Sequence, residues 1–63
     1  MAFRALIIDD EAYARGRIKR LLQNYGEILV IGEASDGKTA LDLINRTIPD
    51  LIFRYSNARV EWI

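Results

Sequence analysis

The sequence predicts a single α/β domain built on a small parallel sheet. Three short apolar segments, at residues 3–8, 28–34 and 51–53, alternate with two segments of helical periodicity, at residues 11–25 and 36–48. The order strand, helix, strand, helix, strand favours parallel pairing through right-handed crossovers. We therefore expect a three-layer βαβαβ unit with strand order 2-1-3, the first strand in the centre and helices on both faces.

Composition narrows the class of protein. The chain has 63 residues, and 51% of them are hydrophobic, which is too many for a disordered segment. Nine acidic and nine basic residues cancel, so no excess charge favours nucleic acid or an anionic membrane. Cysteine and histidine are both absent, which leaves oxygen ligands for any metal ion. No stretch resembles a signal peptide or a membrane span, so we expect a cytoplasmic protein.

The first strand and helix are the most regular part of the pattern. Phe3–Ile8 is broken only by Arg4, as in a strand that is buried on both faces. We expect Asp10 to cap the following helix and Gly26 to end it. The inward face of this helix is predicted from its spacing as Ala14, Ile18, Leu21, Leu22 and Tyr25.

The second half of the unit repeats the alternation. Asp36 is the expected cap of the second helix and Pro49 its stop. The predicted inward face of that helix consists of Ala40, Leu41, Ile44 and Ile48. Residues 54–63 have no helical period, and their weak alternation from Arg59 to Ile63 predicts a possible extra edge strand.

Three carboxylates, Asp9, Asp10 and Glu11, directly follow the first strand. Ligands of open parallel sheets bind beyond the carboxyl ends of the strands, and Mg²⁺ prefers oxygen ligands. The cluster is therefore a candidate magnesium site. The alternative is that these acids only cap the helix and complement its dipole.

A second motif points to a different ligand. Residues 32–39 match the phosphate-loop pattern G-x-x-x-x-G-K-[ST] between an apolar segment and a helix. Its defining residues are Gly32, Gly37, Lys38 and Thr39. Against nucleotide binding, Glu33 and Asp36 would place negative charge beside a polyphosphate. The alternative is a strand end, a turn and an ordinary helix start.

Taken together, the motifs resemble the start of a bacterial response-regulator receiver domain. Within that family they are most similar to the LytTR-type subgroup. The resemblance rests on Ala5-Leu6-Ile7-Ile8-Asp9-Asp10-Glu11, Val30-Ile31-Gly32-Glu33-Ala34-Ser35-Asp36-Gly37 and Pro49-Asp50-Leu51-Ile52-Phe53. It covers Phe3 to Phe53 and implies the first half of a flavodoxin-like fold. We thus expect residues 1–53 to form a truncated receiver and residues 54–63 to be a tail foreign to the family.

The resemblance also implies a function and its loss. Receivers accept a phosphoryl group from a histidine kinase onto an aspartate, and Asp9 and Asp10 would be their magnesium-binding pair. The phosphoacceptor position, two residues after Phe53, is occupied by Tyr55. A phenol replaces neither the nucleophile nor the third carboxylate ligand. We expect weak magnesium binding, no phosphotransfer, no catalytic residue and no enzyme activity.

The tail has a possible origin in a shifted reading frame. Residues 54–63 can be encoded as CGA TAT TCA AAT GCC CGG GTT GAA TGG ATT. Read one base later, the same bases give Asp-Ile-Gln-Met-Pro-Gly-Leu-Asn-Gly, which resembles the family's continuation. The sequence therefore predicts a frameshift near residue 54.

Loss of the remaining sheet would leave an exposed apolar edge, which is a template for pairing with another chain. We expect a homo-oligomer, most simply a dimer. The predicted interface consists of Leu51, Ile52, Phe53, Val60 and Trp62. An alternative is a module that pairs with intact receivers.

Overall fold

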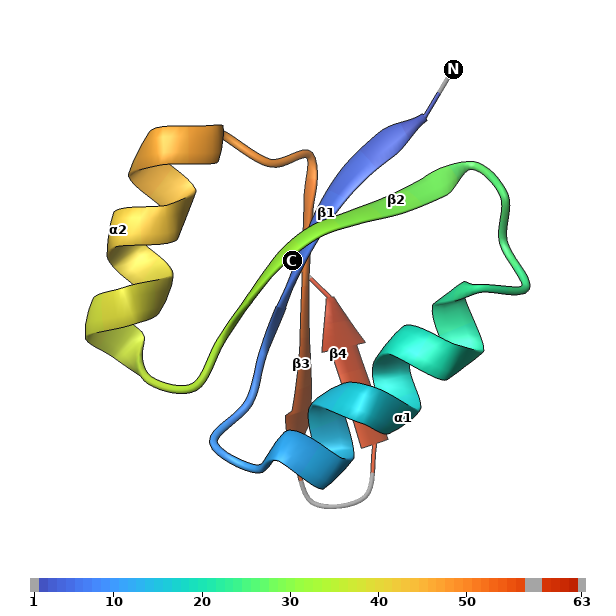
Figure 1. The fold of residues 1–63 in the computed structure, drawn as a ribbon, viewed down its shortest axis with the longest axis horizontal. Coiled ribbons are helices and arrows are strands. Elements are labelled where there is room, and N and C mark those ends of the chain that lie inside the picture. The colour runs from blue at the N-terminus through green and yellow to red at the C-terminus, as the bar shows by residue number, and fades with distance from the viewer. Residues whose placement is uncertain (1, 57–58, 63) are drawn as a thin grey trace.

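The computed structural model describes residues 2–56 and 59–62, and the side chains of residues 2–54. Two helices and four strands are found in this part of the chain (Figure 1). In chain order they are β1 (Phe3–Ile8), α1 (Ala12–Leu22), β2 (Ile28–Ala34), α2 (Gly37–Thr47), β3 (Leu51–Ser56) and β4 (Arg59–Trp62). None of the helices in residues 2–56 is long and apolar enough to cross a membrane.

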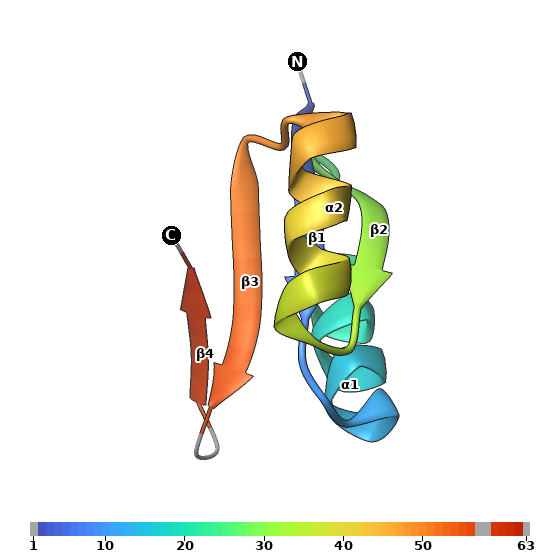
Figure 2. The ribbon, with the colours of Figure 1, turned by 90° about the vertical axis from the view of Figure 1, so that its left-hand side faces the viewer.

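The strands form one sheet in the order β2-β1-β3-β4. β1 pairs in parallel with both β2 and β3, whereas β4 pairs antiparallel with β3. Helices α1 and α2 lie on opposite faces of the sheet (Figures 1 and 2). The predicted α/β class, the parallel order 2-1-3 and the edge strand in the tail are thereby confirmed.

The centre of the core is β1, because both of its faces are covered. Ala5, Leu6 and Ile7 have no exposed surface. On one face, Ile7 packs with Ile18 and Leu22 of α1. Partly buried residues extend this cluster, namely Ile28, Val30 and Phe53. The expectation that the first strand is buried on both faces is correct.

The opposite face holds a tight contact at Gly32. A Cβ atom at this position would lie 3.0 Å from a methyl group of Leu43 and 3.3 Å from one of Leu6. The pairing of β1 with β2 also shifts here, from Ala5 opposite Val30 to Leu6 opposite Gly32. Gly32 therefore lets α2 approach the sheet, which is a packing reason for the glycine that begins the phosphate-loop pattern.

The helix faces differ from their predicted composition. Ala14, Ile18 and Leu22 are buried, but Leu21 is 50% exposed and Tyr25 is 52% exposed. Because α1 ends at Leu22, the helical spacing does not extend to Tyr25.

On α2 the prediction is correct for Ala40, which is buried, but wrong for Leu41 and Ile48. Leu41 is 60% exposed and Ile48 is 76% exposed, while Leu43 is partly buried over Gly32. Since α2 packs mainly against β2, its inward face is narrower than the apolar residues of the sequence suggest.

The helix ends are only partly as predicted. The N-cap position of α1 is Glu11, not Asp10, and its side chain makes no capping bond. Gly26 is not in the left-handed conformation, and α1 ends before it. Asp36 caps α2 as expected, since its carboxylate accepts a hydrogen bond from the Thr39 amide at 2.8 Å. Pro49 follows the end of α2 as expected.

Ile48 closes α2 in an uncommon conformation. Its φ of 48° and ψ of 70° lie in the left-handed region, and it is the single non-glycine residue with positive φ within the described part of the chain. Its carbonyl accepts a hydrogen bond from Arg4 Nη1 at 3.1 Å. The Asp50 carboxylate accepts one from the Arg4 amide at 2.8 Å. These bonds tie the end of α2 to the start of β1.

β3 is longer than the apolar segment from which it was predicted. It continues through Arg54 to Ser56, across the boundary expected between residues 53 and 54. Its last four residues pair with β4, from Phe53 opposite Trp62 to Ser56 opposite Arg59. The tail therefore joins the same sheet as the rest of the chain.

Candidate acidic site

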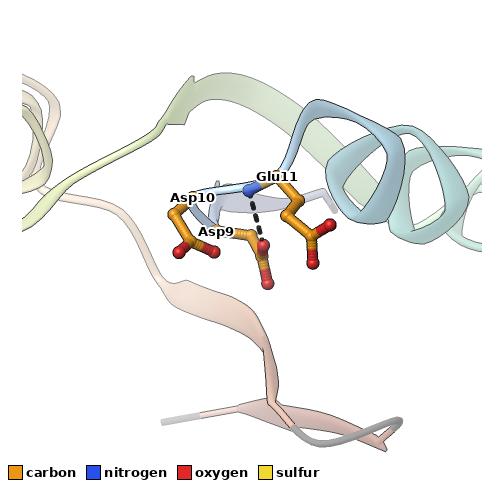
Figure 3. Close-up of side chains that lie close together, drawn as sticks. All are labelled: Asp9, Asp10 and Glu11. Atoms are coloured by element: carbon orange, nitrogen blue, oxygen red, sulfur yellow. Dashed lines mark hydrogen bonds between the residues drawn. The ribbon is translucent and has the colours of Figure 1, made fainter.

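The three acidic residues lie where the parallel strands end. Asp9, Asp10 and Glu11 connect β1 to α1, and one carboxylate oxygen from each lies within 4.8 Å of the others. Figure 3 shows the three side chains projecting from the same side of this connection. Asp9 is 8% exposed, whereas Asp10 and Glu11 are exposed to solvent.

Asp9 is held by hydrogen bonds on each side. Its amide donates to the Ala34 carbonyl at 3.0 Å, which ties the connection to β2. Its Oδ1 accepts from the Glu11 amide at 2.8 Å (Figure 3). Its carbonyl accepts from Arg15 Nη1 at 2.6 Å. Asp9 therefore fixes the connection just before α1, and Asp10, for which the capping role was predicted, is exposed to solvent and does not cap the helix.

Glu33, a carboxylate on β2, is paired with two cations of α1. Its Oε1 accepts a hydrogen bond from Arg15 Nε at 3.2 Å, and its other oxygen pairs with Lys19. The hydrogen bond from Lys19, with the charges of both cations, holds the pKa of Glu33 below its usual range in spite of partial burial. Glu33 is therefore an ion-pair partner and adds no free charge to the acidic cluster.

The donor set suits a hard divalent cation. Asp9, Asp10 and Glu11 offer carboxylate oxygens, and two oxygens on one Mg²⁺ ion can lie at most about 4.2 Å apart. A separation of up to 4.8 Å can close to that value by small rotations of the two exposed side chains. Because Mg²⁺ usually keeps several waters, two protein ligands suffice for weak binding.

The register of β3 brings position 55 to this site. Ile8 at the end of β1 lies opposite Arg54, so the next residue along β3, Tyr55, is at the end of the sheet where Asp9 follows β1. The Tyr55 side chain lies outside the described residues. The position expected to carry the phosphoacceptor is therefore at the same end of the sheet as the acidic cluster, but its residue is a tyrosine.

The phosphate-loop pattern does not form a loop. Gly32 is inside β2, opposite Leu6, and Gly37 begins α2, so only Ser35 and Asp36 connect the two elements. The Thr39 amide already donates to Asp36, and this bond lowers the pKa of that carboxyl below its usual range. A phosphate would have to displace a carboxylate there, and exposed Lys38 does not compensate for it. The geometry disfavours the nucleotide alternative.

The predicted self-association surface is altered by the tail. Leu51, Ile52 and Phe53 are half-buried, and the outer edge of Phe53 is paired with Trp62 of β4. From Phe53 to Ser56 the third strand is therefore not the open edge that was predicted, because β4 pairs with it there. Val60 and Trp62 are in β4, but their side chains lie outside the described residues.

Sequence reasoning missed an apolar groove of about 370 Å³ at the other end of the sheet. Its lining consists of Phe3, Tyr25, Glu27, Ile28, Leu51 and Phe53. These residues come from the starts of the strands and from the connection after α1, which no local motif brings together. Only the exposed aromatic residues Phe3 and Tyr25 give a signal in the sequence, and both were assigned to the interior.

Comparison with known proteins gives named relatives for most of the chain. The chain is 47% identical over 49 residues to a response regulatory protein of Vibrio cholerae, a match that spans 78% of this chain and 21% of that protein. It is 38% identical over 50 residues to the sensory transduction protein LytT of Bacillus cereus, which covers 79% of this chain and 20% of that protein.

A third relative has a different name. The chain is 40% identical over 52 residues to a protein-glutamate methylesterase/protein-glutamine glutaminase of Alkalilimnicola ehrlichii, spanning 82% of this chain and 13% of that protein. The chain thus spans about a fifth or less of the length of these relatives. No protein-family profile matches it.

Proposed function

We propose that this chain, a homologue of bacterial response regulators across about four-fifths of its length, is a receiver-type module of two-component signalling that binds magnesium weakly and does not accept phosphate. One observation carries the proposal. A cluster of three carboxylates ends the central strand of a parallel sheet, and the neighbouring strand brings a tyrosine to the position beside it.

The relatives support a shared module rather than a shared reaction. Because the chain has only 63 residues, the matched segments of 52 and 49 residues must overlap by at least 38 residues. The same part of the chain therefore matches a methylesterase/glutaminase and a response regulatory protein. It also makes up at most a fifth or so of each. We propose that this common part receives a signal in the relatives and is not itself an enzyme.

The proposed metal ligands are Asp9 and Asp10. Asp9 has one oxygen engaged with the Glu11 amide and the other available, and Asp10 is exposed. Without a carboxylate at position 55 the site has fewer anionic oxygens, so we expect dissociation constants in the millimolar range or weaker. A bound Mg²⁺ would neutralise negative charge near the end of β3. Tyr55 offers no carboxylate for phosphoryl transfer, and so no aspartyl phosphate forms there.

Incubation of the protein with acetyl phosphate and magnesium tests the proposal that the chain does not accept a phosphoryl group. Intact mass spectrometry should find no phosphoryl group on the chain, because no carboxylate is present at position 55. A stable phosphoryl adduct on Asp9 or Asp10 would contradict the proposal. An intact response regulator, treated in the same way, serves as the positive control.

Substitution of Tyr55 tests the assignment of the metal site. Tyr55→Asp should tighten magnesium binding at least about tenfold, since unit charges 4 Å apart attract by about 1 kcal/mol even in water and Mg²⁺ carries two. Tyr55→Asn introduces a side chain with the shape of aspartate but without its charge, and it should leave the magnesium affinity almost unchanged. Equal affinities of the two variants, measured from amide chemical shifts near Asp10, would place the ion elsewhere.

We also propose that residues 54–63 arise from a shifted reading frame. The shifted codons spell a continuation that resembles the receiver family, and the matched lengths of 49 to 52 residues are close to the length of the segment Phe3–Phe53. Sequencing the DNA that encodes residues 50–63 tests this. Codons that are incompatible with the shifted reading would rule it out.

A finer proposal concerns partners. β4 ends the sheet at one side of the described part of the chain, and an unpaired strand edge is a template for a second copy. We propose a homodimer that joins through β4 with Trp62 buried, and Trp62→Glu should dissociate it. Sedimentation of the unsubstituted protein as a folded monomer at micromolar concentration would refute this.

Two further partners follow from the family. A histidine kinase is the proposed partner of the intact relatives. Intact receivers are the alternative partner of this chain, and copurification with a full-length relative distinguishes that alternative from self-association.

A further inference from the structure

Arg15 connects three elements around the acidic site. From the first turns of α1, its Nη1 donates to the Asp9 carbonyl at 2.6 Å and its Nε donates to Glu33 on β2 at 3.2 Å. Its side chain is 19% exposed, so these bonds are made partly away from water. A guanidinium holds its donors in a rigid fork, and one side chain can thus fix two acceptors relative to each other.

We infer that Arg15 is a positioning residue for the acidic site, an inference that rests on the proposed magnesium function. The Asp9 carbonyl and the Asp9 carboxylate belong to one residue. When Arg15 fixes the carbonyl, it also fixes the backbone from which the carboxylate accepts the Glu11 amide at 2.8 Å. Arg15 thus orients Asp9 from behind, without contacting the ion.

Glu33 makes this arrangement compatible with a cation site. An unpaired guanidinium next to Asp9 would repel Mg²⁺, but Glu33 is paired with both Arg15 and Lys19. Glu33 leaves the hydrogen bond from Arg15 to Asp9 in place and offsets one of the two positive charges of Arg15 and Lys19.

The direction in which magnesium affinity changes when Arg15 is replaced distinguishes a positioning role from a purely electrostatic effect of its charge. Removal of any cation near the site should tighten magnesium binding by Coulomb's law. Loss of a positioning residue should instead weaken binding, because Asp9 no longer holds its oxygen in place. We expect Arg15→Met to weaken magnesium binding at least threefold, measured from the amide shifts of Asp10 and Glu11.

Arg20→Met is the matched control. It removes the same charge from the same helix, and the Arg20 side chain is exposed and makes no hydrogen bond or ion pair within the described residues. Its magnesium affinity should be unchanged or slightly tighter. Arg15→Lys, which keeps the charge but can reach only one of the two acceptors well, should lie between the unsubstituted protein and Arg15→Met.

A second readout does not depend on magnesium. Hydrogen exchange of the Glu11 amide should accelerate at least threefold in Arg15→Met relative to the amide of Ile18, which reports on global unfolding. If the unsubstituted protein shows no magnesium shifts, the proposed function fails, and the exchange rate alone decides the role of Arg15. If Arg15→Met does not fold, Arg15→Lys decides it by the same measurement. Tighter magnesium binding in Arg15→Met, or an unchanged exchange ratio, would overturn the inference.

Discussion

Replacement of Ile48 by asparagine should stabilise the protein. Ile48 ends α2 with φ of 48°, and a left-handed conformation costs an L-residue about 1–2 kcal/mol, with β-branched residues the least tolerant. Asparagine visits this region far more readily. The backbone bonds, from the Ile48 amide to Ile44 and from Arg4 to the Ile48 carbonyl, do not depend on the side chain.

The cost of the change is small because the side chain is mostly in water. Ile48 is 76% exposed. Burying an isoleucine fully contributes about 1.5–3 kcal/mol, so the quarter that is buried contributes about 0.4–0.7 kcal/mol. We expect Ile48→Asn to raise the free energy of unfolding by about 0.5–1 kcal/mol, a rise of about 2–8 °C in melting temperature for a domain of this size.

Urea denaturation followed by circular dichroism measures the effect. Leu41→Asn is the matched control, since Leu41 is 60% exposed but lies within α2 in ordinary helical geometry. It should destabilise the protein by about 1 kcal/mol through lost burial and poorer helix propensity. If Ile48→Asn destabilises as much as Leu41→Asn, the left-handed conformation carries no strain and the reasoning is wrong.

The remaining predictions concern the core and the pH dependence of stability. Ile18→Ala should cost about 2–5 kcal/mol because Ile18 is 1% exposed in the core, whereas Leu21→Ala on the exposed side of the same helix should cost under about 1 kcal/mol. Both are measured by urea denaturation. The folded-state pKa values of Glu33 and Asp36 are lowered, so their stabilisation is present at neutral pH and is lost as pH falls through those lowered values. Lys19→Met should reduce the acid sensitivity contributed by Glu33, as measured by thermal melts from neutral to acidic pH, since the hydrogen bond from Lys19 is the largest cause of the shift.

The local hydrophobic pattern of the sequence was sufficient to predict the order of the parallel strands in the sheet. Apart from Arg4, Phe3–Ile8 is apolar along both of its faces, and so its central place between two helices could be predicted. Asp36 directly precedes one predicted helix, and it caps α2 as expected. Among the adjacent acids, backbone conformation decides which one stands at the N-cap position, and the sequence does not specify it. Glu11 has that position rather than Asp10, and its side chain makes no capping bond.

Contacts between distant residues could not be predicted in the same way. Arg15 and Glu33 are 18 residues apart, and neither belongs to a periodic pattern that indicates the other. Gly32 fits the first position of a phosphate-loop pattern, and the strand-end alternative left open for it gave no reason for a glycine; the structure shows that its small size allows Leu43 to approach the sheet. In both cases the meaning of the residue depends on which surfaces the fold brings together.

The antiparallel pairing of β4 decides how the sheet can grow. In a parallel α/β sheet, each added strand returns through a crossover and points the same way as its neighbours. β4 reverses that direction and consumes the outer hydrogen-bonding groups of β3 from Phe53 to Ser56. A separate polypeptide supplying further parallel strands would first have to displace β4 from this edge. Binding of such a polypeptide is thus a competition with β4, and a variant without β4 would be the better acceptor.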